Sequence, residues 1–309
     1  MRIVFMGTPD FSVECLKALV ESKHEIVGVF CQPDKPVGRK QILTAPDVKV
    51  EALKHNLDVY QPASLRNGEG VKILEQLKPD LVVVVAYGKI LPHDFLVFPK
   101  YGCINVHASI LPAYRGASPI HAAVLNGDKT TGVTVQQMDD GVDTGDILNI
   151  GTAEIGINDT TEYMYEVLAP LGAKVLMQTI DMIEKGTLNP VKQDESKVSK
   201  AGLLSKEMSS IDWNKTAFEI HNQIRGLYSW PGASTKFGGK TLKIHTSILS
   251  DKKGHNIPGE VVFAKDVLTV CCGDNNCVDL ICVQPEGKKR MDASSFVNGY
   301  RIEKGVILG

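Results

Sequence analysis

Two polar residues, Asn105 and His107, stand two positions apart in the stretch GCINVHASILPAYRG (102–116). Side chains at i and i+2 of a β-strand point to the same face, so this pair would face one side while Val106 packs on the other. An asparagine amide can donate to a developing oxyanion, and a histidine exchanges a proton near neutral pH. The pair suits nucleophilic attack on a carbonyl. Taken alone, it also describes two hydrogen-bonded polar groups at a strand end.

A second stretch, QMDDGVDTGDI (137–147), places four aspartates among glycines. So many like charges in one turn repel each other, which suggests that the turn serves a site. One carboxylate could orient and charge a histidine. A solvated turn or a cation site would show the same composition, although the spacing does not match a calcium loop. The residues alone do not fix which aspartate would meet His107.

The elements that must position these residues follow from hydrophobic periodicity. Apolar or β-branched runs predict strands at 2–6, 25–31, 80–88, 102–107 and 132–138. Helical spacing predicts helices between them at 9–23, 45–56, 67–78 and 118–127. This alternation predicts an α/β fold with a doubly wound, mostly parallel, Rossmann-like sheet. Ligands bind beyond the carboxyl ends of such strands, where Asn105 and His107 lie.

The second half of the chain predicts a change of architecture. A long helix should run from about Asp159, a capping residue with Glu162 three positions on, to about Lys185, with a kink or break at Pro170. A polar, turn-rich stretch follows. We therefore expect a catalytic domain over 1–188, a linker over 189–206 and a second domain over 207–309.

The predicted second domain begins with a helix over 215–227 and continues with short strands separated by turn residues. That pattern predicts a small β-barrel, of the kind that binds oligonucleotides. Residues 205–309 have a formal charge of +3, against −5 for residues 1–204. This weakly indicates a polyanionic partner, and ordinary scatter of surface charge explains it equally well. The basic residues concerned are Lys240, Lys243, Lys288, Lys289 and Arg290.

Composition and short motifs exclude several classes of protein. The chain has 309 residues and a net charge of −2, with no global basic field. GTPDFS (7–12) is not a dinucleotide fingerprint, and no phosphate loop is present. No apolar run approaches the ~20 residues of a membrane-spanning helix. The seven cysteines lack zinc-site spacing and read as reduced thiols, so we expect a cytoplasmic protein, and nothing in the sequence demands more than a monomer.

The motifs together resemble the folate-dependent formyltransferases. NVHASILPAYRG and MDDGVDTGDIL mark the wider class. The further motifs GTPDFS, QPDKPVGRK, AYGKILP, LSKEMSSIDW, IRGLYSWPG and PEGKKRM occur in the order found in members that formylate methionyl initiator tRNA. Together the motifs cover essentially the whole chain.

The resemblance implies a catalytic trio of Asn105, His107 and Asp143. The donor would be 10-formyltetrahydrofolate, the acceptor the α-amine of methionine on initiator tRNA, and no metal would be needed. Asn105 would donate to the oxyanion, while His107, oriented and kept protonated by Asp143, would stabilise that charge. The folate would be enclosed by Ser109, Ile110, Leu111, Pro112, Ala86, Tyr87, Ile90 and Asp139.

The stretch QPDKPVGRKQIL (32–43) is basic through Lys35, Arg39 and Lys40, and its two prolines and glycine predict an irregular loop. The resemblance implies that this loop inserts at the acceptor end of the tRNA, with Arg39 as the main contact. Here Gln41 and Ile42 follow Lys40, so the loop carries less charge than the family pattern. Without the resemblance, it also reads as a solvated surface loop.

Two alternatives remain open from the sequence. The acceptor could be a small amine, such as glycinamide ribonucleotide or an amino sugar nucleotide. The basic loop is the better discriminator, since sugar-modifying relatives can carry a similar second domain. The chain could instead be a non-catalytic tRNA-binding or oligonucleotide-binding protein, against which the complete trio argues. Arg115 could contact substrate or pin its loop, and we assign Trp230 and Pro231 to packing.

Overall fold

The computed structural model describes residues 1–38, 40–66 and 68–309, which form two compact units. The first comprises Met1–Gly116, Thr131–Ala153 and Tyr165–Ala201. The second comprises Ala117–Thr130, Glu154–Met164 and Gly202–Gly309. Most of the stretch predicted as a linker, up to Ala201, therefore belongs to the first unit.

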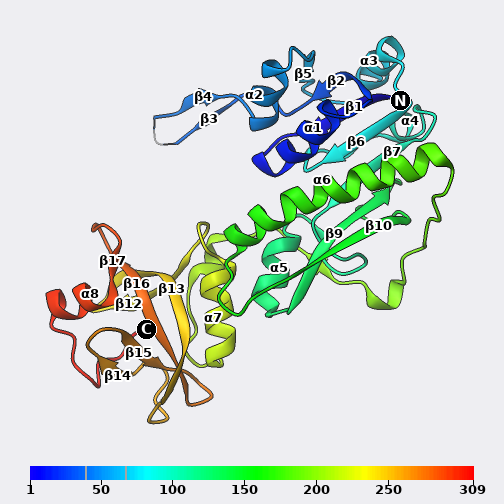
Figure 1. Cartoon of the computed structure of the whole chain (residues 1–309). Coiled ribbons are helices and arrows are strands. Elements are labelled where there is room, and N and C mark those ends of the chain that lie inside the picture. The colour runs from blue at the N-terminus through cyan, green and yellow to red at the C-terminus, as the bar shows by residue number, and fades with distance from the viewer. Residues whose placement is uncertain (39, 67) are drawn as a thin grey trace. The chain divides into compact units, whose positions relative to one another are not determined.

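The first unit is built on a seven-stranded sheet in the order β10-β9-β7-β6-β1-β2-β5 (Figure 1). Strand β1 pairs in parallel with β2 and β6, β2 with β5, and β6 with β7. The predicted α/β fold with a mostly parallel sheet is confirmed. The strands are β1 (Arg2–Gly7), β2 (Glu25–Phe30), β5 (Val59–Tyr60), β6 (Leu81–Val85), β7 (Cys103–His107), β9 (Thr130–Gln137) and β10 (Ile147–Glu154).

Helices lie on both faces of this sheet. On one face, a Cβ atom added at Gly172 of α6 would lie 3.3 Å from Val106, 3.7 Å from Val133 and 3.9 Å from Cys15 of α1, so both helices pack there. On the other face, Leu74 of α3 and Phe95 of α4 join the core around Val82 and Val84. The helices are α1 (Val13–Val20), after a 3-10 turn at Asp10–Ser12, α2 (Asp47–Lys54), α3 (Glu69–Leu77), α4 (His93–Leu96) and α6 (Thr161–Lys185).

One strand departs from the expected direction. Strand β9 runs antiparallel to β7, with Asn105 opposite Gln136 and His107 opposite Thr134. Because β9 begins at Thr130, beyond His107 in this register, the connection between the two strands stays at the end where β7 finishes. It does not cross back as a parallel connection must. The predicted strand exists, but its parallel pairing was wrong.

The helix does not break at Pro170, because α6 is one continuous helix of 25 residues with this proline inside it. Proline removes one backbone donor. The helix is nevertheless held by burial of its inner face, where Leu168, Ala173, Val175 and Leu176 are buried. Gly172 permits the close approach to Val106 described above.

The stretch predicted as an irregular loop forms a short hairpin instead. Strand β3 (Lys35–Val37) pairs antiparallel with β4 (Ile42–Thr44), and Lys35 lies opposite Thr44. These two strands form a separate two-stranded sheet. Pro36, which has no N–H to donate, therefore does not interrupt the hydrogen bonding of a larger sheet. Gly38 and Gln41 take left-handed backbone angles in the connecting turn, with φ of 71° and 49°.

The second unit contains a six-stranded antiparallel sheet in the order β12-β13-β16-β15-β14, with β17 on β16. Helix α7 packs on this unit through Ile220 and Ile224, which join the core of the sheet. The second domain predicted from short strands is confirmed as an antiparallel β-sheet domain. Its elements are α5 (Pro119–Asn126), α7 (Ala217–Gly226), β12 (Ala233–Phe237), β13 (Lys240–Lys253), β14 (Val261–Ala264), β15 (Leu268–Cys271), β16 (Asn276–Pro285), β17 (Met291–Asp292) and α8 (Ala293–Tyr300).

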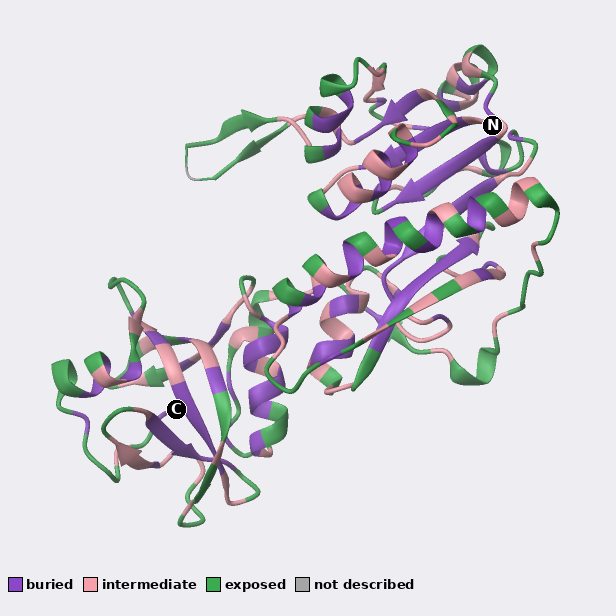
Figure 2. Cartoon of the chain, viewed as in Figure 1, coloured by how far each residue is buried: buried purple, intermediate pink, exposed green. Residues whose placement is uncertain are grey.

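Burial follows this layering (Figure 2). Strand β6 is buried along its whole length, as its continuous β-branched sequence predicts for a central strand covered on both faces. The hairpin β3–β4 is exposed along both strands. The chain thus places a rigid buried sheet under the polar residues of β7.

Candidate active site

The end of strand β7 presents its polar residues on one face. Cys103, at the start of the strand, belongs to the core shared with α3 and α4. Asn105 and His107 follow at two-residue spacing and point to that same side, while Val106 lies against α6. His107 is buried, with 6% of its surface exposed, whereas Asn105 is half-buried.

The aspartate turn after β9 folds back along its own strand. The backbone N–H of Gln137 donates to Asp146 O at 2.9 Å. A Cβ atom at Gly145 would meet Gln137 O at 1.6 Å, so only glycine fits this close approach. Asp139 accepts from Gly141 N at 3.0 Å and from Thr144 Oγ1 at 2.6 Å, which ties the turn together. The fold-back brings Asp143 over the side chains of β7 and β9.

Asp143 is the aspartate that reaches the β7 residues. Its Oδ1 accepts from Asn105 Nδ2 at 3.4 Å and lies 3.5 Å from His107 Nδ1. Its backbone φ is 55°, a left-handed conformation that costs about 1 kcal/mol for a residue other than glycine. The predicted trio is therefore brought together in one cluster.

Two further groups hold this carboxylate in place. Gln136 Nε2 donates to Oδ1 at 2.9 Å, and the backbone N–H of Gly116 donates to Oδ2 at 2.8 Å. Gln136 is buried, and its Oε1 has no hydrogen-bond partner among the described residues. The orientation of Asp143 thus depends on a side chain outside the predicted trio.

His107 is fixed by a second contact. Its Nε2 lies 3.0 Å from the carbonyl oxygen of Tyr114. A carbonyl oxygen only accepts, so Nε2 carries the proton of the neutral ring. The lone pair of the neutral ring is then on Nδ1, the nitrogen that faces Asp143. A proton taken up at Nδ1 would create an imidazolium directly beside the carboxylate.

Arg115 acts as a loop pin. Its guanidinium donates through Nε to Gln193 Oε1 at 3.0 Å, and through Nη1 and Nη2 to Glu195 at 3.3 and 2.7 Å. The hydrogen bonds from Arg115, and to a smaller extent its charge, lower the pKa of the Glu195 carboxyl. Gln193 in turn donates to the carbonyl oxygens of Asp143 and Gly145 at 2.9 and 2.7 Å. Arg115 therefore braces the aspartate turn, and β8 (Arg115–Gly116) pairs with β11 (Lys200–Ala201) beside it.

The residues expected around the folate divide into two groups. Ser109, Leu111 and Tyr87 have buried side chains, so they shape the local backbone. For example, Ser109 Oγ donates to Ala113 O at 2.6 Å, and the Leu111–Pro112 peptide bond is cis. The others are exposed or half-buried: Ala86, Ile90, Asp139, Ile110 and Pro112.

The segment that leads from β6 into α4 meets the aspartate turn through His93, the first residue of α4. His93 Nδ1 lies 3.1 Å from both carboxylate oxygens of Asp140. Ile90 and Val142 are 72% and 60% exposed on these two segments. Exposed apolar side chains beside polar groups are typical of a surface that covers an aromatic ligand.

The residues expected at the tRNA lie in or beside the hairpin β3–β4. Lys35 and Lys40 are exposed, and Arg39 falls outside the described residues. Val37, Ile42 and Leu43 are also exposed on the hairpin, by 56%, 62% and 67%. The hairpin therefore combines positive charge with apolar surface.

Sequence reasoning missed Gln136, Gln193 and the Tyr114 carbonyl. Gln136 could have been found from the alternation in β9, once that strand is paired with β7. Gln193 lies in a stretch whose composition predicts only a linker, and no sequence signal points to it. A backbone carbonyl carries no side-chain signature at all.

The cluster can carry out acyl-type transfer with protein groups alone: a neutral amide donor, a histidine with one free lone pair and a carboxylate beside it. Within the described ranges, no group of three or more His, Cys, Asp or Glu is placed to hold a metal ion. Nor does any described helix have the length and apolarity needed to cross a membrane.

A doubly wound sheet that carries this cluster defines a group-transfer enzyme acting at a carbonyl. Residues 1–180 match the family described as formyl transferase, and residues 203–301 match the formyl transferase C-terminal domain. The chain belongs to the formyl transferase family and is an enzyme of formyl transfer.

Relatives cover the whole chain. The chain is 46% identical over 310 residues to the methionyl-tRNA formyltransferase of Alkaliphilus oremlandii, with all of both sequences covered. It is 45% identical over 309 residues to the methionyl-tRNA formyltransferase of Bacillus subtilis, covering all of this chain and 98% of that one.

Solved structures share the fold at lower identity. The sugar 3N-formyl transferase WlaRD superposes with a TM-score of 0.70 at 23% identity, covering 94% of this chain and 99% of that one. Glycinamide ribonucleotide transformylase 1 of Symbiobacterium toebii superposes with a TM-score of 0.53 at 19% identity, covering 63% and 94%. Formyl transfer to different amines thus takes place on this fold.

Proposed function

We propose that this chain transfers the formyl group of 10-formyltetrahydrofolate to the α-amine of methionyl initiator tRNA, for translation initiation in the cytoplasm. One observation carries the chemistry: Asp143 lies within 3.5 Å of both Asn105 Nδ2 and His107 Nδ1. The acceptor is supported by the full-length relatives named methionyl-tRNA formyltransferase.

Asn105, His107 and Asp143 are the proposed catalytic residues. The amine nitrogen attacks the formyl carbon, and the carbonyl oxygen becomes an oxyanion that accepts a hydrogen bond from Asn105 Nδ2. His107 Nδ1 takes the proton that the amine nitrogen must lose, and Asp143 stabilises the resulting imidazolium. The same proton returns to the folate nitrogen as its bond to the formyl carbon breaks, so charge and protons balance.

Two contacts adjust the expected role of His107. The Tyr114 carbonyl fixes the tautomer, and Asp143 supplies the charge next to the exchanging nitrogen. The 3.5 Å separation from Asp143 is longer than a hydrogen bond, and catalytic contacts commonly tighten when substrate binds. The proposed role of His107 thus depends on its orientation by both Tyr114 O and Asp143.

The donor would bind against the two exposed apolar segments near the trio. Ile90 and Val142 suit the flat face of a pterin, and the buried Ser109 and Leu111 fix the backbone wall beside it. The solved structure of WlaRD, which has the same fold, was obtained with 5-N-formyl-THF. The proposed folate residues remain Ser109, Ile110, Leu111, Pro112, Ala86, Tyr87, Ile90 and Asp139.

The tRNA would be bound by Lys35, Arg39 and Lys40 of the sequence stretch 32–43 and by the second domain. Basic side chains neutralise phosphates without reading bases, and this binding weakens as salt rises. We keep 1–188 as the catalytic part, 189–206 as the linker and 207–309 as the tRNA-binding part of this proposal. A monomer suffices for the reaction.

The test is formyl transfer from 10-formyltetrahydrofolate to charged initiator tRNA, with charged elongator methionine tRNA in parallel. We expect transfer to the initiator species and little to the elongator. Transfer to neither tRNA, but to an amino sugar nucleotide, would reassign the acceptor and leave the site chemistry intact. Binding of tRNA with no transfer to any acceptor would contradict the catalytic proposal.

A further inference from the structure

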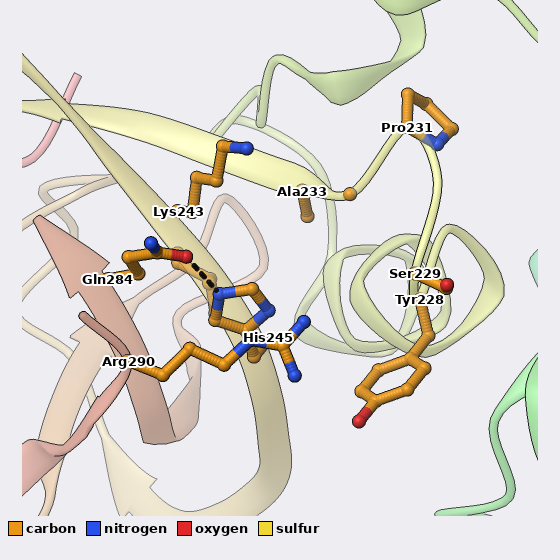
Figure 3. A pocket seen from close by; sticks show the side chains of 10 residues that line it. Tyr228, Ser229, Pro231, Ala233, Lys243, His245, Gln284 and Arg290 are labelled. Atoms are coloured by element: carbon orange, nitrogen blue, oxygen red, sulfur yellow. Dashed lines mark hydrogen bonds between the residues drawn. The ribbon is translucent and has the colours of Figure 1, made fainter. Parts of the chain in front are cut away.

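A pocket in the second unit lies well apart in sequence from the catalytic trio (Figure 3). It has a volume of about 100 Å³. Lys243 and His245 of β13 form one side, Arg290 of the β16–β17 turn and Gln284 of β16 close it, and Tyr228 and Ser229 line it from the segment after α7.

The side chains that line this pocket are basic or neutral. Lys243 and Arg290 are positively charged, and none of the lining residues, all of which are described, carries a carboxylate. Neither of these two cations forms an ion pair with a described residue. The carboxylates nearest in sequence have other partners: Glu286 accepts from Thr241 N and Asp292 accepts from Ser295 N. Two uncompensated cations therefore face one small cavity.

His245 adds a third basic group whose orientation is fixed. Gln284 Nε2 donates to Lys288 O at 2.8 Å, which turns Gln284 Oε1 toward the ring. That oxygen lies 3.0 Å from His245 Nε2 and only accepts, so Nε2 carries a proton in the neutral ring (Figure 3). The lone pair is left on Nδ1, where a second proton would create a third positive charge.

The surroundings of His245 disfavour the protonated form of its ring. Burial lowers the pKa of His245, the positive charges of Arg290 and Lys243 lower it further, and the hydrogen bond that the ring donates to Gln284 Oε1 opposes them. An anion between these groups would reverse the effect of the two cations, because an opposite charge favours the protonated ring. Anion binding should therefore be accompanied by proton uptake.

Backbone geometry supports a preformed wall on the remaining side. Ser229 has a φ of 76° and Gly232 a φ of 81°, both left-handed. The backbone N–H of Gly232 donates to Leu227 O at 2.9 Å, which closes the turn after α7. Left-handed serine persists only when the surroundings enforce it. Tyr228 and Ser229 thus line the pocket from a turn whose backbone is already defined.

We propose that this pocket binds a phosphate monoester, presented either by the end of a nucleic-acid strand or by a small phosphorylated molecule. A guanidinium, an ammonium and an imidazole around one small cavity suit a compact dianion with several acceptor oxygens. The hydroxyl groups of the lining residues Tyr228 and Ser229 could donate to a remaining oxygen. The mechanism proposed for formyl transfer does not use this pocket. Its binding of phosphate can therefore be tested without folate or acceptor.

The first measurement is calorimetric titration of the full chain with inorganic phosphate at constant ionic strength. We expect saturable binding at one site, weakened at least tenfold by Arg290→Gln and by Lys243→Gln. Lys289→Gln and Lys240→Gln are the matched controls, because these exposed lysines do not line the pocket, and they should change affinity less than twofold. No saturable binding, or equal losses in all four variants, would overturn the proposal.

Proton uptake separates this site from a general basic surface. Sulfate stays a dianion at every pH used, so any protons taken up when sulfate binds are bound by the protein and not by the ligand. Titrations at pH 6.5 in two buffers of different ionisation enthalpy should show uptake in the wild type and almost none in His245→Gln. Equal uptake in the two proteins would contradict the role of His245.

Competition identifies the source of the phosphate. Displacement of inorganic phosphate by adenosine monophosphate indicates a small molecule, and displacement only by a 5′-phosphorylated oligonucleotide indicates a strand end. Equal displacement by the same oligonucleotide without its terminal phosphate would overturn monoester recognition.

Discussion

The side-chain amide of Gln136 donates a 2.9 Å hydrogen bond to Oδ1 of Asp143, while the oxygen of the same amide is buried without a partner among the described residues. A carboxylate only accepts, so the amide cannot reverse to satisfy its oxygen without losing the bond. A buried acceptor left without a partner costs about 1–3 kcal/mol. The site therefore keeps Asp143 in position at some cost in stability.

The Gln136→Leu variant should separate the effect of the hydrogen bond to Asp143 on the rate from the effect of the unpaired amide oxygen on stability. We expect kcat to fall roughly ten- to a hundredfold, because Asp143 loses one of its two shortest hydrogen bonds, with each KM within threefold. Thermal unfolding should move little, since removing the unpaired oxygen offsets the lost bond. The comparison is Gln137→Leu, whose amide donates to Cys103 O at 2.9 Å and does not touch the trio. A large rise in the KM for tRNA would instead indicate that Gln136 contacts the acceptor.

Asp143→Asn tests the charge of the trio. Asparagine tolerates the left-handed backbone at this position and can still accept from Gly116 N, so the fold should be kept. The imidazolium at His107 would lose its neighbouring negative charge, and we expect single-turnover formyl transfer to slow by roughly a hundredfold or more. Circular dichroism melting checks the fold. A variant within tenfold of wild type would remove Asp143 from the mechanism.

Strands β7 and β9 show which features of the site the sequence predicts and which it does not. The spacing of Asn105 and His107 predicts their shared face, because strand alternation is a local property. The choice of Asp143 among four aspartates depends on the resemblance, since the fold-back of the turn is set by Gly145 packing on Gln137 O. The antiparallel β9 could not be predicted, because strand direction is decided by where the whole connection lies.

The hairpin β3–β4 and helix α6 show a second limit. Local proline and glycine signals predicted a loop at 32–43 and a break at Pro170, and both were overridden by pairing or packing. The pairing of Lys35 with Thr44 is a cross-strand contact, and the burial of one face of α6 depends on tertiary packing. The secondary-structure propensities of the local residues carry no information about either. Gln193 illustrates the same limit in the site, because its contact with Asp143 O spans 50 residues.

Gln193 supports the aspartate turn through two hydrogen bonds, so its loss should lower the rate although it touches no substrate in the proposed mechanism. Gln193→Ala removes both donors to the carbonyls of Asp143 and Gly145. We expect kcat to fall about tenfold with both KM values unchanged, since the turn loses support but no substrate contact. Glu195→Gln is the control, because Glu195 is exposed and its ion pair with Arg115 should add little. Steady-state kinetics with both substrates checks the pair, and equal losses in the two variants would argue against the brace.

The basic stretch 32–43 should affect the binding of tRNA and leave the binding of folate unchanged. Arg39→Ala is expected to raise the KM for charged initiator tRNA about tenfold and to reduce the salt dependence of tRNA binding by about one phosphate contact. The KM for the folate should not change. Lys72→Ala, an exposed lysine of α3, is the matched surface control. Unchanged kinetics toward both substrates would show that 32–43 is a solvated segment without a role in binding.

The second unit should lose stability as pH falls, partly through His221. Its Nε2 lies 2.8 Å from Ile157 O, and its Nδ1 lies 2.9 Å from Ser247 Oγ. Burial lowers the pKa of His221 below its usual value of 6.5, and the charge of Arg225 lowers it further, while the bond to Ile157 opposes them. The unfolded chain therefore binds this proton more readily. The contribution of His221 is fully present above about pH 6.5 and is lost as pH falls toward the folded-state pKa.

We expect the free energy of unfolding to decline between about pH 7 and pH 5, by up to about 1.4 kcal/mol per pH unit for each such group. His221→Gln can place a donor on Ile157 O and an acceptor on Ser247, and it should flatten part of this slope. The rest stays, because burial also lowers the pKa of His245 and His121 in this unit. Urea unfolding at pH 7.5, 6.5 and 5.5 measures the slope, with His255→Gln, an exposed histidine, as the control. Parallel slopes for wild type and His221→Gln would show that His221 is not one of the groups that titrate on unfolding.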